Sequence, residues 1–397
     1  NHEQQHVRGL GNMKRKLEDE HELIIDQNIP SSDVTAAKHD LASEVVAHVK
    51  ILNSTVSSAE ADRALVKRSI HILSDLSKNE DIVDIIVESG VVSALVLHLQ
   101  APEWKEVAEA RPYEHEVEKR SAFTLGLLAI KPEYQQLIVD AGAVPHLVAL
   151  LKRHKDGENS RAVNGVIRRA ADAITNLAHE NSSIKTRVSV DGGIPPLVEL
   201  LECTDAKVQR AAAGPCVGVI GNLVHSSPNI KKEVLLAGAL QPVIELLSSS
   251  CSESQREAAL LLGQFAAGDT DCKIDIVQRG AVFPLIELLQ SPDAQVREMS
   301  TFALGRLAQA GIAHGGGIPP LLKLLDSSNA NVQNNAAFAL YGLADNEYNV
   351  ADLIRVGGVQ KLQDGEYKLQ PTRDIVAKTL KRLEENVHGR ICKRSKM

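Results

Sequence analysis

Aromatic and cysteine residues are scarce in this chain of 397 residues. Only 3% of the residues are aromatic, and the one tryptophan is Trp104. The five cysteines stand far apart, between Cys203 and Cys392, without the spacing of a metal site. Their odd number indicates a reducing compartment rather than a disulfide framework. Small and branched aliphatic side chains must therefore fill the core, and we expect neither a metal ion nor a cofactor.

The chain also lacks an excess of positive charge and any long apolar run. Its formal net charge is −7, which disfavours a protein that binds nucleic acid mainly through phosphates. The sequence contains no stretch of about 18 apolar residues, so it predicts no membrane span. The first residues carry no apolar segment of the secretory type. We therefore expect no membrane contact.

What the sequence does contain is a recurring glycine followed by an apolar, leucine-rich turn. Successive spacings are 52, 50, 46, 42, 36 and 41 residues, between Gly90, Gly142, Gly192, Gly238, Gly280, Gly316 and Gly357. A period near 40 in a chain of helical character predicts a solenoid of stacked helical units. Such proteins act by presenting a long surface.

Each unit contains three predicted helices. A short helix leads into the glycine, whose lack of a Cβ permits a sharp turn, and a second helix follows, often with Pro in its first turn. A longer third helix carries small residues on its packed face. We expect third helices at about 63–78, 116–130, 163–179, 206–224, 253–267, 294–309, 330–344 and 371–385.

The irregular spacings predict local departures from this unit. The two longest reflect loops at 101–115 and 153–162. Gly214, Pro215 and Cys216 interrupt a third helix, and because an interior proline costs roughly 3 kcal/mol, we expect two half-helices joined out of step. The shortest spacing leaves room for only a stub of the short helix after Ala308.

Three regions follow from these patterns. Residues 1–40 are polar and charged and predict a disordered tail. Residues 41–386 form the solenoid, and residues 387–397 form a basic C-terminal tail. The fold class is therefore all-α, with flexible ends.

Three helices per unit with glycine between the first two resembles the armadillo repeat. The phrases Ile167-Arg-Arg-Ala-Ala-Asp-Ala-Ile-Thr-Asn-Leu-Ala-His-Glu-Asn and Phe338-Ala-Leu-Tyr-Gly-Leu-Ala-Asp-Asn-Glu are similar to those of the plant armadillo–BTB (ARIA-like) proteins. The resemblance covers about residues 41–390. It implies a right-handed superhelical solenoid of about seven armadillo repeats.

The same resemblance implies a non-catalytic adaptor that holds a protein partner, often a transcription factor, in the nucleus and also in the cytoplasm. In that family a C-terminal BTB domain dimerises or docks a cullin-type ubiquitin ligase. This chain departs from the pattern near Gly214 and between Gln309 and Ala310, where the family has extra residues. After His388-Gly-Arg it has no BTB sequence, so we expect the armadillo portion alone.

Third helices line the concave groove of an armadillo solenoid, and their polar residues are therefore the candidate contacts. One recurring position holds Asp75, Leu127, Asn176, Asn222, Gln264, Arg306 and Gly342. An amide side chain there could hold a peptide backbone, since it both donates and accepts hydrogen bonds. The paired tryptophans of importin-α are absent from these helices, which argues against an import receptor.

Basic residues also gather on the predicted third helices. They are Arg168, Arg169, Arg210, Arg256, Arg297 and Arg306. One interpretation is a groove that attracts an acidic or amphipathic partner segment. The other is a solvated helix face with local partners such as Glu257 and Glu298. The spacing alone leaves both open.

A short basic cluster lies in the predicted N-terminal tail. Lys14, Arg15 and Lys16 are interpreted as a nuclear-import signal or as solvated charge.

The sequence contains no Ser/His/Asp or Cys/His arrangement that predicts catalysis, and we expect no enzyme activity. Besides a nuclear adaptor for a transcription factor, two functions remain open: the substrate-recognition part of a BTB/cullin ubiquitin-ligase adaptor, and a catenin-like cytoskeletal scaffold.

Overall fold

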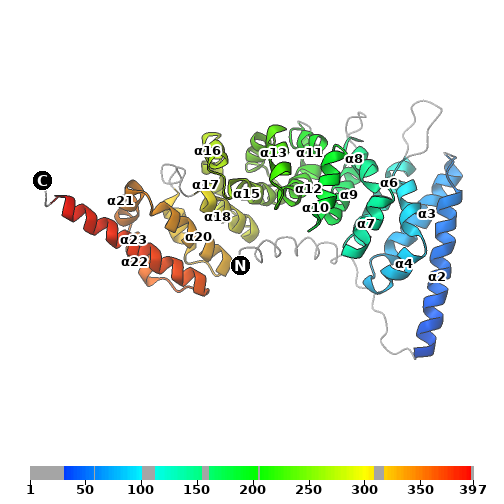
Figure 1. Ribbon diagram of the computed structural model, residues 1–397, viewed down its shortest axis with the longest axis horizontal. Coiled ribbons are helices and arrows are strands. Elements are labelled where there is room, and N and C mark those ends of the chain that lie inside the picture. The colour runs from blue at the N-terminus through cyan, green and yellow to red at the C-terminus, as the bar shows by residue number, and fades with distance from the viewer. Residues whose placement is uncertain are drawn as a thin grey trace.

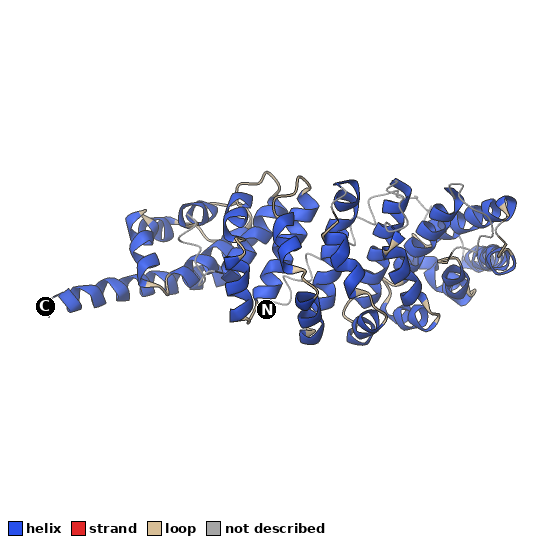
Figure 2. Ribbon diagram, turned by 90° about the horizontal axis from the view of Figure 1, so that it is seen from above, coloured by secondary structure: helices blue, strands red, loops and turns tan. Residues whose placement is uncertain are grey.

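The computed structural model is an elongated body in which helices follow one another in chain order, from α2 at one end to α23 at the other (Figure 1). The structure describes residues 31–57, 59–100, 112–153, 161–203, 206–307 and 317–394. Within these ranges every regular element is a helix (Figure 2). The predicted all-α class is therefore confirmed.

Eight long helices form the spine of the stack, and each packs on the next. Their bounds match the predicted third helices to within a few residues, apart from the end of the last one. They are α3 (Glu60–Leu76), α6 (Pro112–Leu128), α9 (Arg161–Ala178), α12 (Ala206–Val224), α15 (Ser252–Ala266), α18 (Ala294–Leu307), α20 (Ala330–Leu343) and α23 (Gln370–Arg394).

Shorter helices complete each unit. The first helices are η1 with α4 (Glu80–Ile82, Val83–Glu88), α7 (Pro132–Asp140), α10 (Ser182–Val190), α13 (Pro228–Leu236), α16 (Thr270–Gln278) and α21 (Glu347–Arg355). The second helices are α5 (Val91–Leu97), α8 (Ala143–Leu151), α11 (Ile194–Leu201), α14 (Leu240–Leu246), α17 (Val282–Leu288), α19 (Ile318–Leu324) and α22 (Gly358–Asp364). The predicted helical stub and most of both predicted long loops lie outside the described residues.

The repeated glycines make the turn between the first and second helices. Every repeat glycine in the described ranges has a left-handed backbone, with φ between 80° at Gly192 and 90° at Gly142. Side chains other than hydrogen disfavour this conformation. The sequence periodicity therefore marks the positions where the backbone needs glycine.

A Gly142→Ala substitution should lower the free energy of unfolding by about 1 kcal/mol through backbone strain alone. The reason is that φ at Gly142 is 90° and no atom lies within 4 Å of an added Cβ. The matched control is Gly165→Ala inside α9, where alanine is the better helix former and the nearest contact, 3.1 Å away, is the flexible Lys119 chain. Chemical denaturation measures both, and a loss at Gly165 equal to that at Gly142 would contradict the assignment.

One hydrophobic cluster runs through the whole stack, from Val45 on α2 to Leu383 on α23. It is built mainly from Ala, Val, Ile and Leu, as the shortage of aromatic residues predicted. Small residues let the spine helices approach closely: a Cβ added to Gly126 on α6 would lie 3.3 Å from the Cα of Ala173 on α9. Burial along one continuous core holds successive units in register.

The prediction of two half-helices around Pro215 is wrong. Helix α12 runs unbroken from Ala206 to Val224, with Pro215 inside it. The proline ring would press on the backbone one turn earlier, and that turn carries only alanine and glycine, at positions 211–214. Burial of both flanking segments between α9 and α15 offsets the missing backbone hydrogen bond.

Both ends of the solenoid are longer than predicted. Helix α2 spans Ser31–Ser54, so residues 31–40, predicted as tail, are helical. Likewise α23 continues to Arg394 through most of the predicted tail 387–397. Adding a residue to an existing helix needs no new nucleation, so a helix anchored by packing extends into exposed polar sequence. Residues 1–30 lie outside the described ranges.

Polar side chains of the first helices brace the C-terminal ends of the third helices. The Gln135 Nε2 donates to the carbonyl oxygen of Asn176 at 3.0 Å. At the equivalent place, Lys185 Nζ donates to His225 O at 2.9 Å and Lys231 Nζ to Phe265 O at 2.7 Å. Carbonyls in the last turn have no partner within their helix and attract cations. The same position thus caps three successive units.

Candidate binding groove

The recurring amide position faces the neighbouring spine helix. Asn176 Nδ2 on α9 donates to Gly126 O on α6 at 2.9 Å, and Asn222 Nδ2 on α12 donates to Thr175 O at 2.7 Å. Gln264 on α15 continues the series, since a Cβ at Gly221 would lie 3.1 Å from its Oε1. Asn176 and Asn222 therefore tie one third helix to the next, and the donors that a peptide would need are already engaged at both residues.

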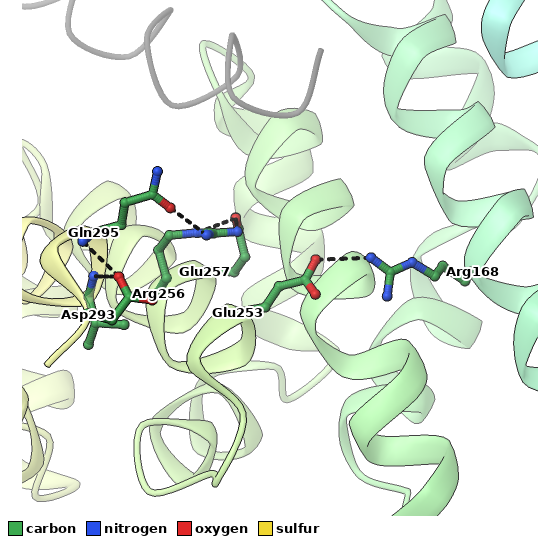
Figure 3. A network of polar contacts seen from close by, with 7 residues as sticks. Arg168, Glu253, Arg256, Glu257, Asp293 and Gln295 are labelled. Carbon is green, nitrogen blue, oxygen red and sulfur yellow. Dashed lines mark hydrogen bonds and ion pairs between the residues drawn. The ribbon is translucent and has the colours of Figure 1, made fainter. Parts of the chain in front are cut away.

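Four of the predicted basic residues make contacts with acidic, amide or aromatic side chains: Arg168, Arg169, Arg256 and Arg306. Arg168 Nη2 lies 3.3 Å from Glu253 Oε1, an ion pair between α9 and α15 (Figure 3). Arg169 lies over the Phe123 ring, with its guanidinium carbon 4.5 Å from the ring centroid. Its Nη1 lies 3.6 Å from Asp172 Oδ2.

Arg256 on α15 is the centre of a second set of contacts. Its Nη1 donates to Gln295 Oε1 at 2.6 Å, and its Nη2 lies 3.3 Å from Glu257 Oε1 (Figure 3). Glu257 is thus a local acidic partner of Arg256, as the interpretation of a solvated helix face predicted. Arg168, Arg169 and Arg256 are half-buried, so their side chains are still partly accessible to solvent.

The remaining basic candidates lie further along the spine. Arg297 Nη1 donates to the Ser291 carbonyl at 2.5 Å, and Arg306 lies over the Phe302 ring at 5.4 Å. Arg210 belongs to α12, but its side chain is outside the described part of the structure. The same holds for Lys14, Arg15 and Lys16.

Positive charge predominates on the four central third helices, α9, α12, α15 and α18. Their bases are Arg161, Arg168, Arg169, Lys207, Arg210, Arg256, Arg297 and Arg306. Their acids are Asp172, Glu253, Glu257 and Glu298. In a chain of net charge −7, this local excess of bases stands out.

A groove of about 1040 Å³ opens at the C-terminal end of this surface. Its apolar part includes Leu260 on α15 with Met299 and Phe302 on α18, and Gln264, Arg306 and Asn335 supply polar groups. Residues of α13 and of the turn into α16 also line the groove. Sequence reasoning found Gln264 and Arg306 but missed the apolar residues, because helical periodicity assigns them to the core.

Asp269 lies in the wall of this groove and caps α16. Its Oδ1 accepts from Cys272 N at 3.0 Å, and its Oδ2 lies 3.1 Å from Lys231 Nζ. The Cys272 hydrogen bond, with a smaller contribution from Lys231, lowers the pKa of Asp269 below its usual value of 3.8. The carboxylate therefore contributes stability above pH 3.8, which is lost as the pH falls through the lowered pKa.

An Asp269→Ala substitution should lower the free energy of unfolding by about 1 kcal/mol at neutral pH through loss of the helix cap. Asp269→Asn is the matched control, since asparagine also caps helices but carries no charge. It should retain most of the stability and lose the dependence on acid pH, as measured by denaturation between pH 2 and 7. Equal losses in both variants would show that the ion pair, not the cap, matters.

The described residues contain neither a candidate metal site nor a candidate membrane span. No group of three His, Cys, Asp or Glu side chains within them is arranged to hold a metal ion. None of the described helices has the length and apolar character that crossing a membrane requires.

Two of the cysteines have thiols whose pKa is raised by burial. The pKa of Cys272 is raised to about 11, and that of the fully buried Cys216 is raised as well, which favours the neutral thiol in both.

Comparison with known families places armadillo repeats in this chain. Residues 131–179, 184–214 and 313–345 match the Armadillo/beta-catenin-like repeat, and residues 283–311 match the HEAT repeat. The structure resembles an engineered protein with 26% identity and a TM-score of 0.64, over 91% of this chain and 97% of that one. It also resembles a designed armadillo repeat protein in complex with peptide (KR)4, with 26% identity and a TM-score of 0.52, over 63% and 98% of the two chains.

Two proteins of Arabidopsis thaliana are similar to this chain in sequence. The ARM repeat protein interacting with ABF2 is 65% identical over 198 residues, which cover 49% of this chain and 28% of that protein. Armadillo BTB Arabidopsis protein 1 is 51% identical over 204 residues, covering 51% and 27%. The matched region thus spans less than a third of either relative. The chain is an armadillo-repeat solenoid that resembles the armadillo–BTB proteins over their repeats.

Proposed function

We propose that this armadillo-repeat chain is an adaptor that holds a segment of a nuclear regulator, such as a transcription factor, against the third helices α9 to α20. The observation that carries the proposal is the excess of bases on the central third helices beside the open groove between α15 and α18. A relative with 65% identity is named for its interaction with ABF2, a transcription factor, which suggests the class of partner.

The rigidity of the stack supports this mechanism. A single core joins all the units, and side-chain amides lock adjacent third helices, so the surface is ordered before a partner arrives. A flexible partner segment would then bear most of the entropy loss on binding. Electrostatic attraction to the central bases would speed the encounter.

Calorimetric titration of the purified chain with ABF2 tests the proposal. We expect binding that weakens at least tenfold when Arg168 and Arg306 are both replaced by Glu. The control for each of the two reversals is Lys323→Glu, a single charge reversal at an exposed residue of the second helix α19, to be compared with Arg168→Glu and Arg306→Glu singly. Absence of binding, or equal weakening by the control, would reject the groove as the binding surface.

Nuclear localisation is a second part of the proposal and rests on Lys14, Arg15 and Lys16. A fluorescent fusion of the whole chain should accumulate in nuclei, and replacement of these three residues by Ala should shift it to the cytoplasm. Unchanged accumulation would assign nuclear entry to another segment or to the partner.

The ubiquitin-ligase adaptor is the second candidate, favoured by the BTB protein among the similar sequences. It would give the same groove a different purpose, namely substrate recognition. Co-precipitation of a cullin with the chain, lost when a BTB-containing relative is depleted, would support this function over simple transcriptional regulation.

A further inference from the structure

The ion pair between Arg168 and Glu253 joins two third helices that have a further third helix, α12, packed between them. Helix α12 packs between α9 and α15, yet Arg168 on α9 reaches Glu253 on α15 at 3.3 Å, across a sequence separation of 85 residues (Figure 3). The contact therefore passes across α12. It bridges the surface on which the basic residues gather.

Gly214 on α12 leaves the space for this bridge. A Cβ at Gly214 would lie 3.1 Å from Cγ of Glu253 and 3.5 Å from its Cδ. The absence of a side chain thus lets the glutamate lie over the α12 backbone toward Arg168. The same glycine that made the sequence look interrupted leaves room for a carboxylate among the basic residues of α9, α12, α15 and α18.

Both side chains of the pair are partly accessible to a binding partner. The Arg168 side chain is 38% exposed and that of Glu253 is 21% exposed. A partly exposed ion pair between long side chains contributes only modestly to stability, because solvent screens it and both side chains lose conformational freedom. Another carboxylate could therefore replace Glu253 at Arg168 at low cost.

We propose that Glu253 is an internal competitor: in the free protein it occupies the place at Arg168 that a carboxylate of an acidic polypeptide segment takes in the complex. This inference rests on the proposed function and specifies the chemistry of the partner. Bases outnumber acids on α9, α12, α15 and α18, and Glu253 already demonstrates that Arg168 binds a carboxylate.

The experiment uses the full chain and a fluorescein-labelled octaglutamate peptide, with binding followed by fluorescence anisotropy at low salt. Glu253→Gln keeps the shape of the side chain and removes the competing charge. We expect it to bind the peptide about two- to five-fold more tightly than the wild type, the range expected for release of an exposed ion pair. Arg168→Gln should bind more weakly, and the double variant should show no gain from Glu253→Gln.

Glu245→Gln on α14 is the matched control, since it changes the net charge equally at an exposed residue outside the groove. Equal tightening by this control would reduce the effect to net charge and overturn the proposal. So would unchanged or weaker peptide binding by Glu253→Gln, or no peptide binding by either protein. A larger gain for an oligothymidylate than for the peptide would overturn it in favour of a phosphate site.

Folding and the proposed function are checked separately. Thermal melting of Glu253→Gln should match the wild type to within 2 °C, and Glu253→Ala provides a second variant that also removes the carboxylate. A lower melting temperature without tighter peptide binding would show that the pair only braces the helices. If ABF2 binds the wild type while Glu253→Gln leaves the affinity for octaglutamate unchanged, the competition is rejected and the adaptor function stands. If ABF2 does not bind, the adaptor function is rejected whatever the peptide result.

Discussion

Replacement of Phe265 by alanine is expected to lower the free energy of unfolding by about 3–5 kcal/mol. Phe265 is fully buried on α15 and is one of the largest enclosed side chains in a core built mainly from aliphatic residues. The neighbouring helices can close the cavity only partly, because each is held by the next unit of the stack.

The loss should also split the unfolding transition. In a solenoid each unit contacts only its neighbours, so a weakened central unit uncouples the two halves. Guanidinium denaturation followed by circular dichroism should show one transition for the wild type and two for Phe265→Ala. Phe283→Ala on α17 is the control, because that ring is 62% exposed and its loss should change stability by no more than about 0.5 kcal/mol. Similar effects of the two substitutions would contradict the assignment of the core.

Replacement of Lys185 by alanine should lower the free energy of unfolding by about 2–3 kcal/mol. Lys185 is 4% exposed on α10, and its Nζ donates to the His225 carbonyl at the end of α12. Truncation leaves that carbonyl without its donor and removes the packing of the side-chain stem. Lys232→Ala, at an exposed lysine of the equivalent helix α13, is the control and should be nearly neutral. Equal stability of Lys185→Ala and the wild type would show that the first helices do not brace the spine.

The same lysine gives the wild type a pH dependence with a definite sign. Burial lowers the pKa of Lys185 below its usual 10.5, against a smaller opposite effect of Glu180. The unfolded chain therefore binds this proton more tightly than the folded one, so the contribution of Lys185 to stability rises with pH between the lowered pKa and 10.5. Denaturation between pH 7 and 11 should show a rise in the wild type that Lys185→Ala lacks.

The sequence predicted the repeating parts of this fold well and the unique contacts poorly. The glycines that end the first helices were recognisable because a left-handed backbone excludes most other residues, and α9 and α15 carry strong helical periodicity. Pro215 was misread, since the cost of an interior proline depends on the side chains one turn earlier and on burial. Residues 35–40 of α2 and 387–388 of α23 are exposed, so no buried hydrophobic face marked these turns as helical.

The candidate site was predictable only as a set of residue types. The positions of Asn176 and Asn222 followed from aligning the third helices, but their hydrogen bonds to the preceding helix depend on the distance between units. The pairing of Arg168 with Glu253 depends on how the stack curves over α12, which no local pattern encodes. For this reason the sequence left the basic groove and the solvated face as open alternatives.

The most direct test of the account places a photoreactive residue on either side of the solenoid. p-Benzoylphenylalanine at position 306, which lines the groove on α18, should cross-link to bound ABF2, and the same residue at position 323 on α19 should not. Mass spectrometry of the irradiated complexes identifies the products. Cross-links from position 323 with none from position 306 would contradict the claim that the third helices form the binding surface.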